Sequence, residues 1–567
     1  MLSSCNVLFV YPQFPANTFW NNKAVCKVQK ARHSAIPLGL ITVAALLPAD
    51  WTCRLIDRNV SDVTEKDFAW ADLIMTGGMN VQRFDCLKLI AMAQEHGKIV
   101  VVGGPDITSE PNFYSHADFR IIGEAESVID KFVAAWRAGH RTGTFIAEKF
   151  TADVTSTPVP RFDLVRPPDY LYFAVQFSRG CPFTCEFCDI IELYGRVPRV
   201  KTPAQMLHEL KTLYTSGYRG HVDFVDDNFI GNKKAIKRFL PHLIAWQEEH
   251  SYPFSFSTEA SINLADDDEL LALMRRAGFF VVFVGIESPD TATLVATQKK
   301  QNARRSLSDS IHKIYRAGMF VIAGFIVGFD SERASVTESL VTCIEDTDIP
   351  ISVVGLLTAL ANTQLARRLK RENRVYSVEW QARLFGDGGG DQCTLGLNFE
   401  TLRPRRDVLS DYKKVVERVY APRAYFGRIN RVMRRLDCFW PDQKNTQQGL
   451  RFAGLERDDW ATLLRLMGSV IRKHPFLLGY YVKALYTCAR VNPGALRAVG
   501  IMAAYYLHLG PFSRVVEAAI AKQIEDIDMG RWRSPLASLA GEPTANEFLS
   551  YIEDKPSVSF ERASAST

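Results

Sequence analysis

FSRGCPFTCEFC, residues 177–188, places three cysteines at C-x3-C-x2-C spacing on a loop that follows an apolar run. Soft thiolate ligands at short spacing are typical of iron–sulfur clusters. Three ligands for four irons leave one iron open to a small molecule, as a catalytic zinc keeps one position open. The alternatives are three buried cysteines without a metal, or a zinc knuckle with Asp189 as its fourth ligand. The spacing favours a cluster held by Cys181, Cys185 and Cys188.

Strand and helix patterns alternate regularly after this loop. Six strand–helix repeats can be counted between residues 173–177 and residues 351–357. This alternation predicts an open (βα)6 barrel over residues 169–400, with its chemistry at the carboxyl ends of the strands. Those ends carry Asp226, Asp227 and Glu287. A helix cap or a solvated carboxylate is the alternative role for each of them.

Residues 1–140 show a second alternation of short apolar strands and helices, which predicts a Rossmann-like parallel sheet with both faces covered. Ligands of such sheets bind beyond the carboxyl ends of the strands, where glycines let backbone approach a large planar ligand. No G-x-G-x-x-G follows the first strand, so a dinucleotide is not expected. Residues 141–168 are expected to be a linker. The candidate ligand-binding residues of this domain are Asp57, Gly77, Gly78, Gly103, Gly104, Gly123 and Glu124.

Composition bounds the class of protein. The chain has 567 residues, 47% of them hydrophobic and 23% charged, which is typical of a globular protein of about two to four domains. A net charge of +5 gives no reason to expect nucleic acid as a partner. Eight of the eleven cysteines are scattered singly, so a reducing cytoplasmic setting is expected rather than a disulfide framework. No signal peptide and no apolar run of about 18–20 residues is found.

The last third of the chain is expected to be helical over residues 401–530, with a disordered tail at residues 531–567. Several of these helices are apolar over most of their surface, so they are either buried or face lipid. One interpretation is a small bundle packed on the barrel. The other is an apolar lid over a lipophilic substrate, with contact to the inner face of the cytoplasmic membrane. In this membrane-contact interpretation, anionic lipid headgroups would contact Arg423, Arg428, Arg431, Arg434 and Arg435.

The cysteine loop, with Phe187 before its last cysteine, resembles that of radical S-adenosylmethionine (SAM) enzymes. The resemblance implies a [4Fe–4S] cluster whose open iron chelates the amino and carboxylate groups of SAM. It places Asp226 or Asp227 where the family usually has Gly-Gly-Glu, which binds the methionyl ammonium. It also implies that Glu287 accepts hydrogen bonds from the ribose, and that the strand with Gly324 and Ile326 contacts adenine.

The N-terminal region resembles the cobalamin-binding domain of cobalamin-dependent radical SAM enzymes. The matching points are Pro-Leu-Gly-Leu at residues 37–40, Gly-Gly-Pro at residues 103–105 and Gly-Glu-Ala-Glu at residues 123–126. The D-x-H-x-x-G run of the histidine-ligated mutases is absent. The resemblance therefore implies cobalamin bound base-off with no histidine ligand. The alternative is a ligand-free domain used only for packing.

Asn-Thr-Phe-Trp at residues 17–20 and VDDNFIGN at residues 225–232 look like a subgroup that contains hopanoid 2-methylases and bacteriochlorophyll side-chain methylases. The resemblance implies methylation of an unactivated carbon of a lipophilic polycyclic substrate, with a hopanoid favoured. It also implies two SAM per methyl group and a flavodoxin- or ferredoxin-type electron donor. An oxidative cyclase with the same cofactors and a non-enzymatic cobalamin sensor remain alternatives. A methylthiotransferase acting on transfer RNA would need three more clustered cysteines, which the chain lacks.

Overall fold

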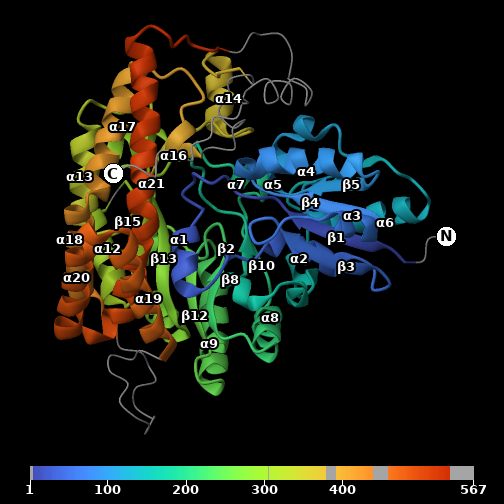
Figure 1. Cartoon of the computed structure of the whole chain (residues 1–567), viewed down its shortest axis with the longest axis horizontal. Coiled ribbons are helices and arrows are strands. Elements are labelled where there is room, and N and C mark those ends of the chain that lie inside the picture. The colour runs from blue at the N-terminus through green and yellow to red at the C-terminus, as the bar shows by residue number, and fades with distance from the viewer. Residues whose placement is uncertain (1–3, 304, 378–390, 439–456, 537–567) are drawn as a thin grey trace.

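Two parallel sheets divide the chain into two lobes (Figure 1). The structure, a computed structural model, describes residues 4–303, 305–377, 391–438 and 457–536. The N-terminal lobe is on the right in Figure 1, and the barrel with the C-terminal helices forms the left. The predicted α/β class is confirmed. The predicted tail lies outside the described residues from residue 537 onward.

The N-terminal lobe is a six-stranded, all-parallel sheet in the order β3-β1-β4-β5-β6-β7. Val7 and Phe9 of β1 pack under α2 and α6, whereas Leu8 and Val10 pack against the helices of the opposite face. Successive strand side chains point to opposite faces, so continuous apolar strands fit a sheet covered on both sides. The elements are β1 Asn6–Tyr11, α2 Leu38–Leu46, β3 Thr52–Asp57, α3 Glu65–Trp70, β4 Leu73–Gly77, α4 Arg83–Glu95, β5 Ile99–Gly103, α5 Pro105–Ser109, β6 Phe119–Ile122, α6 Ile129–Arg137 and β7 Gly143–Ile146.

The segment predicted as a linker, residues 141–168, begins with a strand. β7 pairs in parallel with β6 at the edge of the sheet, and three short 3-10 turns follow it. The prediction is therefore wrong for the start of this segment. The strand is held by its backbone ladder, because none of its four side chains is fully buried and no apolar run marks it.

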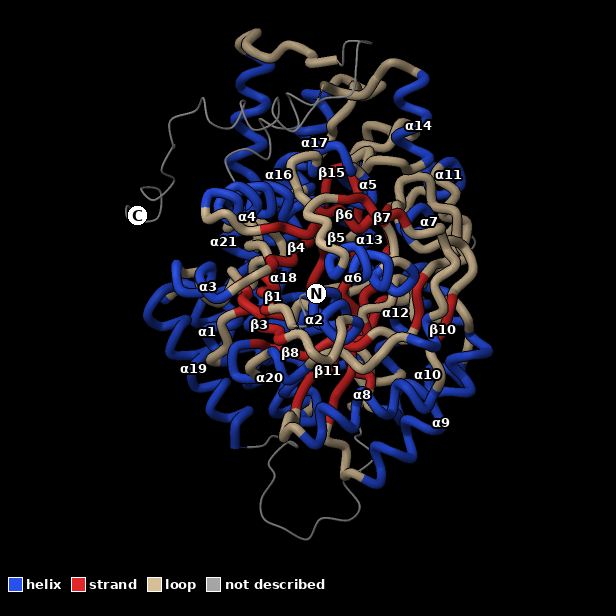
Figure 2. The backbone as a smooth tube through the Cα atoms, turned by 90° about the vertical axis from the view of Figure 1, so that its right-hand side faces the viewer, coloured by secondary structure: helices blue, strands red, loops and turns tan. Residues whose placement is uncertain are grey.

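The barrel is a seven-stranded parallel sheet in the order β15-β14-β13-β12-β11-β8-β2. Its six predicted strands are confirmed, and their helices cover the outside of the sheet. In Figure 2 the N-terminal lobe faces the viewer, and α8, α9 and α10 of the barrel lie below it. The elements are β8 Tyr170–Val175, α7 Ile190–Leu193, α8 Pro203–Thr215, β11 Gly220–Phe224, α9 Lys233–Glu249, β12 Phe254–Glu259, α10 Asp268–Ala277, β13 Phe279–Glu287, α11 Thr291–Ala296, α12 Leu307–Arg316, β14 Phe320–Val327, α13 Val336–Asp346 and β15 Ile351–Leu356.

The seventh barrel strand comes from the N-terminal part of the chain. β2, His33–Ala35, pairs with β8, and α1, Lys23–Gln29, packs against the C-terminal helices α19 and α21. The sequence pattern does not predict β2, because three residues are too few to show a period. The two lobes are therefore interwoven rather than joined by one crossing.

The C-terminal region is helical, as predicted. Its last helix, α21, runs unbroken for 33 residues through Pro511. None of the described helices is long and apolar enough to cross a bilayer. The elements are α14 Gln364–Arg371, α16 Gln392–Leu395, α17 Arg405–Tyr420, α18 Pro422–Arg435, α19 Arg457–Lys473, α20 Leu478–Val491 and α21 Leu496–Asp528.

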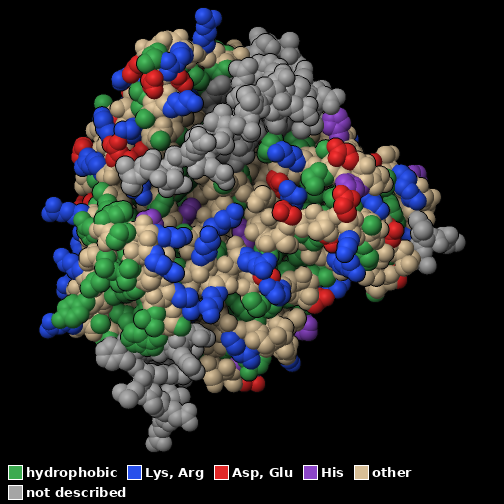
Figure 3. All heavy atoms as spheres, in the orientation of Figure 1, with side chains coloured by type: hydrophobic (Ala, Val, Ile, Leu, Met, Phe, Trp, Pro, Cys, Tyr) green, Lys and Arg blue, Asp and Glu red, His purple; other side chains and the backbone are tan. Residues whose placement is uncertain are grey.

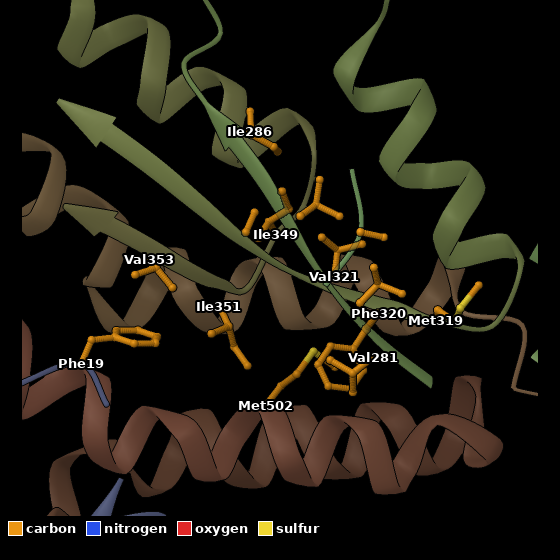
Figure 4. Close-up of a cluster of buried hydrophobic side chains, with 14 of the residues drawn as sticks. Phe19, Val281, Ile286, Met319, Phe320, Val321, Ile349, Ile351, Val353 and Met502 are labelled. Carbon is orange, nitrogen blue, oxygen red and sulfur yellow. The ribbon is translucent and has the colours of Figure 1, made fainter. Parts of the chain in front are cut away.

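α21 packs across the barrel sheet. In Figure 4, Met502 points from this helix toward Ile351 and Val281 at the amino-terminal ends of their strands. All three side chains belong to one buried cluster that joins the barrel to the C-terminal helices. Burying each large apolar side chain stabilises the contact by about 1.5–3 kcal/mol. The C-terminal helices are thus part of the barrel's core.

The arginines of α18 do not form a free basic face. Arg428 is fully buried and pairs with Glu345, while Arg431 and Arg435 pair with Asp348. The predicted headgroup contact is therefore wrong for Arg428, Arg431 and Arg435, because carboxylates of α13 and the turn after it already pair with them.

Candidate functional site

The cysteine loop begins at the end of β8 and is fixed at its base by a buried carboxylate. Asp226, at the end of β11, accepts hydrogen bonds from the Phe177 N–H at 3.0 Å, and from the Ser178 N–H and hydroxyl at 2.5 Å each. Burial raises the pKa of Asp226 to about 7. Three donors on two oxygens make Asp226 the anchor of the loop.

Asp227 is placed differently from its neighbour. Its Oδ2 accepts the Gly180 N–H at 3.1 Å, and no described residue donates a hydrogen bond to its Oδ1. Burial raises the pKa of Asp227 to about 6. Of the two predicted aspartates, Asp227 therefore keeps the oxygen that a bound cation could use.

The three cysteines share one cation and separate hydrogen-bond donors. Lys299 lies within electrostatic range of all three thiols and pairs with Glu287 at 2.8 Å. Asn228 Nδ2 lies 3.7 Å from Cys181 Sγ, and Gln301 Nε2 lies 3.8 Å from Cys185 Sγ. Such donors to sulfur tune a cluster's potential. Burial raises the pKa of each thiol, so metal binding would release protons.

These residues fit a cluster better than a single ion. Within the described part of the chain, no three His, Cys, Asp or Glu side chains converge to hold one metal ion. The zinc-knuckle alternative has no support from this arrangement. A cubane cluster does not need its three cysteine sulfurs to meet at one point, because each sulfur binds a different iron. The shared cation and the donors to sulfur match a negatively charged thiolate set.

Glu287 and its surroundings occupy the position predicted to contact ribose. Glu287 has a φ of +67°, a conformation that side chains rarely adopt. A Cβ on Gly285 would lie 2.3 Å from Glu287 Oε1, and one on Gly324 would lie 3.9 Å from Oε2. Gly285 therefore gives room for the carboxylate, whereas a Cβ at Gly324 would be in ordinary van der Waals contact with it. Gly324 and Ile326 share the partly exposed face of β14.

The inner face of the barrel carries a polar group that the sequence reasoning did not single out. His221 Nε2 lies 2.8 Å from Ser257 Oγ, which donates in turn to Asp223. His221 also makes edge contacts with Tyr172 and Phe280, at centroid distances of 5.7 and 5.2 Å. Alternating polar residues at 221, 223, 255 and 257 were the available signal.

We call the space inside the sheet the lumen. Its wall also includes Phe283, Ile322 and Ile326, which are partly exposed on the same face as the polar group. Glu259, at the end of β12, has accessible surface, yet burial and four neighbouring carboxylates raise its pKa to about 8. Glu259 was also missed, although it lies at a strand end like Asp227.

A cavity of about 430 Å³ lies at the carboxyl ends of the N-terminal strands. Six of the seven candidate residues of this domain line it. The exception is Asp57, which is buried and bonds instead to Asn59 and to the Tyr170 hydroxyl. This placement corrects the prediction for Asp57, because its oxygens already hold a turn and the first barrel strand. The candidates that line the cavity are Gly77, Gly78, Gly103, Gly104, Gly123 and Glu124.

Three of these glycines are required by the fold. A Cβ on Gly77 would lie 2.1 Å from the Gly103 carbonyl oxygen, and Gly104 and Gly123 have φ values of +98° and +89°. At Gly103, by contrast, a Cβ would meet nothing closer than 3.7 Å. Gly103 therefore keeps space in the cavity rather than space in the sheet.

The cavity and the cysteine loop share a wall. Arg179, two residues before Cys181, pairs with Glu124 at 3.0 Å and with Glu126 at 2.7 Å. Arg199 pairs with Glu124 at 2.8 Å, and all four side chains are largely buried. Removing one partner of a buried pair costs about 3–5 kcal/mol, so this cluster fixes the loop against the cavity. Tyr194, Lys201 and Val225 of the barrel also line the cavity.

Comparison with known proteins identifies the family. The chain is 47% identical over 431 residues to an uncharacterized methyltransferase of Synechocystis sp., an alignment covering 76% of this chain and 78% of the relative. It is 37% identical over 400 residues to the hopanoid C-2 methylase of Rhodopseudomonas palustris, covering 70% and 73%. The model described as the radical SAM superfamily matches residues 175–340. The chain belongs to the radical SAM superfamily.

Two further matches concern the C-terminal region of this radical SAM protein and its fold as a whole. Residues 363–522 match a family described as a domain of unknown function, DUF4070. The solved structure of OxsB, a cobalamin-dependent SAM radical enzyme with aqua-cobalamin and SAM bound, aligns with a TM-score of 0.55. That alignment covers 98% of this chain and 84% of OxsB at 15% identity, so it shows a shared fold. The predicted resemblance to radical SAM proteins and to hopanoid methylases is confirmed.

Proposed function

We propose that this protein is a cobalamin-dependent radical SAM C-methyltransferase acting on a lipophilic polycyclic substrate, with hopanoid A-ring methylation favoured. The observation that carries the proposal is the wall shared by the cysteine loop and the N-terminal cavity. A cluster and a cobalamin bound there would act on one substrate from neighbouring positions. The relatives named methyltransferase and hopanoid C-2 methylase support the same activity.

The residues would divide the cofactors between them as follows. Cys181, Cys185 and Cys188 would hold the [4Fe–4S] cluster. Asp227 would take the SAM ammonium through its free oxygen, Glu287 the ribose, and the face with Gly324 and Ile326 the adenine. When bound, the cluster and SAM supply a 5′-deoxyadenosyl radical that removes a hydrogen atom from the substrate. Cobalamin supplies a methyl group for the carbon that lost the hydrogen. The protein positions the groups and keeps water out.

Cobalamin would occupy the cavity at the N-terminal strand ends. We propose that it binds base-off with no histidine ligand, and the described residues that line the cavity include no histidine. Gly103, Gly104 and Gly123 would let backbone approach the ring closely. A flavodoxin- or ferredoxin-type protein is the proposed electron donor, and the cytoplasm is the proposed location.

The lumen suits a largely apolar substrate with a polar end. Phe283, Ile322 and Ile326 offer an apolar wall, while His221 and Ser257 offer hydrogen bonds deeper in the barrel. We infer that the polycyclic skeleton lies against the wall and that a hydroxyl group reaches the polar group of Asp223 and Ser257, which His221 orients through hydrogen bonds between its two ring nitrogens and serine hydroxyls. A buried site built to bond a hydroxyl group discriminates against an analogue that lacks it.

The activity is tested by deleting the gene in its host and comparing lipid and pigment extracts by mass spectrometry. We expect loss of a polycyclic lipid that is one CH2 heavier than a retained neighbour. Loss of a methylated pigment instead would indicate a bacteriochlorophyll-type methylase. An oxidised product without a new methyl group would indicate a cyclase. A reconstituted protein that cleaves no SAM would leave only a cobalamin sensor and overturn the proposal.

His221→Phe tests the polar end of the lumen. Phenylalanine leaves the Ser255 and Ser257 hydroxyls without the imidazole that orients them toward the substrate. Losing a hydrogen bond to a buried partner costs about 1–3 kcal/mol, so KM for a hydroxylated substrate should rise about 5- to 150-fold. Substrate lacking the hydroxyl group should be affected less, and SAM cleavage without substrate should be unchanged. His208→Phe, an exposed position on α8, is the matched control. Equal effects on both substrates would contradict the role of His221 in binding the hydroxyl group. His221→Gln, which keeps hydrogen-bonding groups, separates the loss of hydrogen bonds from a change in packing.

A further inference from the structure

An exposed apolar surface lies over α19, α20 and the turn between them. Figure 3 shows hydrophobic side chains gathered at the lower left, where these helices lie in Figure 1, with Lys and Arg at the rim. Leu464 is 73% exposed, Phe476 65% and Tyr486 61%. Contiguous exposed apolar patches mark interaction sites. We call this surface the docking face, made of Leu464, Ile471, Phe476, Val482, Tyr486 and Val491.

The charges on the helices of the docking face are positive beyond residue 459, whereas Glu417 and Glu517 lie near Phe476 at one edge of the face. No Asp or Glu occurs from residue 460 to residue 516. Arg472, Lys473, Lys483 and Arg490 are exposed, and none of them forms an ion pair with a described residue. Elsewhere on this protein, exposed arginines commonly have carboxylate partners, as Arg406 has Asp528. Cations without carboxylate partners beside apolar side chains favour an anionic surface as the occupant.

We propose that the docking face binds the surface of an anionic lipid bilayer, with its apolar side chains in the interface and its cations against headgroups. A second copy of the chain fits less well, because a twofold contact through this face would bring like charges together. The face lies away from the N-terminal lobe, so the cavity would stay open to the cytoplasm (Figure 1). This inference does not depend on the identity of the substrate.

The test is sedimentation of the full-length protein with vesicles of phosphatidylglycerol and phosphatidylcholine, against vesicles of phosphatidylcholine alone. We expect binding to the anionic vesicles that weakens as salt rises. The variant with Lys473→Gln, Lys483→Gln and Arg490→Gln should bind about 100-fold more weakly, at about 1 kcal/mol for each cation. Phe476→Ser should weaken binding without removing its salt dependence.

Ile146→Asp is the matched control, because Ile146 is an exposed apolar residue on the N-terminal lobe. It should bind vesicles as the unchanged protein does. Circular dichroism and SAM cleavage in solution check that every variant is folded. Equal affinity for both vesicle types, or no affinity for either, would overturn the proposal. So would a dimer in light scattering that the triple variant dissociates, since the face would then join two copies.

Discussion

Cys185→Ala should abolish formation of 5′-deoxyadenosine from SAM while leaving the N-terminal cavity able to bind cobalamin. Cys185 is buried, accepts a hydrogen bond from Gln301 and lies close to Lys299. An alanine there removes one of three sulfur ligands and one of the three thiols that lie near Lys299. Because the cavity lies on the other side of the shared wall, its own lining is unchanged.

The measurements separate the two sites. Iron and sulfide content and low-temperature EPR of anaerobically reconstituted protein report the cluster, and absorbance of bound cobalamin reports the cavity. Cys53→Ala is the control, because Cys53 lies on β3 and is remote from the loop in sequence. Iron content and SAM cleavage at the unchanged level in Cys185→Ala would show that the loop does not hold the cluster.

Most of the fold follows from periodicity in the sequence. The barrel strands β13, β14 and β15 are largely apolar runs, and helices separate the six strands predicted in the barrel, which is the pattern of a parallel sheet covered by helices. β7 and β2 escaped prediction because one is an exposed edge strand and the other has three residues. α21 continues through Pro511 because tertiary packing of its buried face outweighs the local preference to break at proline.

The candidate site shows where sequence reasoning stops. Position at a strand end identified Asp226 and Asp227 together, but only the contacts with Phe177 and Ser178 show that Asp226 supports the loop. Asp57 also lies at the end of a strand, but it accepts a hydrogen bond from the hydroxyl of Tyr170, which is 113 residues away in the sequence. Such partners are set by how the two lobes pack. His221 and Glu259 required the same knowledge, since a polar residue in a strand can face lumen, helix or solvent.

The buried ion pairs between the two lobes explain why the two cofactor sites would act together. Glu124 and Glu126 lie in the turn that ends β6, and Arg179 lies on the cysteine loop. A shift of that turn therefore moves the loop. Catalysis is sensitive to displacements of about 1 Å, so a rigid ionic link between the two sites is a requirement of the proposed reaction.

Gly103→Leu should separate methyl transfer from SAM cleavage. The position tolerates a side chain sterically, because a Cβ there would meet only Ile121 at 3.7 Å and 3.8 Å. The leucine would instead fill part of the cavity. Overpacking costs about 1–3 kcal/mol, so cobalamin binding should weaken about 5- to 150-fold and methylated product should fall with it. The cluster contacts lie elsewhere, so 5′-deoxyadenosine should still form.

Two substitutions frame this result. Gly103→Ala adds one methyl group and should lose less cobalamin than the leucine variant. Gly77→Ala should lose the fold of the N-terminal lobe, because its Cβ would lie 2.1 Å from the Gly103 carbonyl oxygen. Thermal unfolding distinguishes these cases, with Gly103→Leu melting near the unchanged protein. If Gly103→Leu kept full cobalamin affinity, the ligand would lie outside the cavity. If it lost SAM cleavage as well, the two sites would depend on each other more strongly than their shared wall implies.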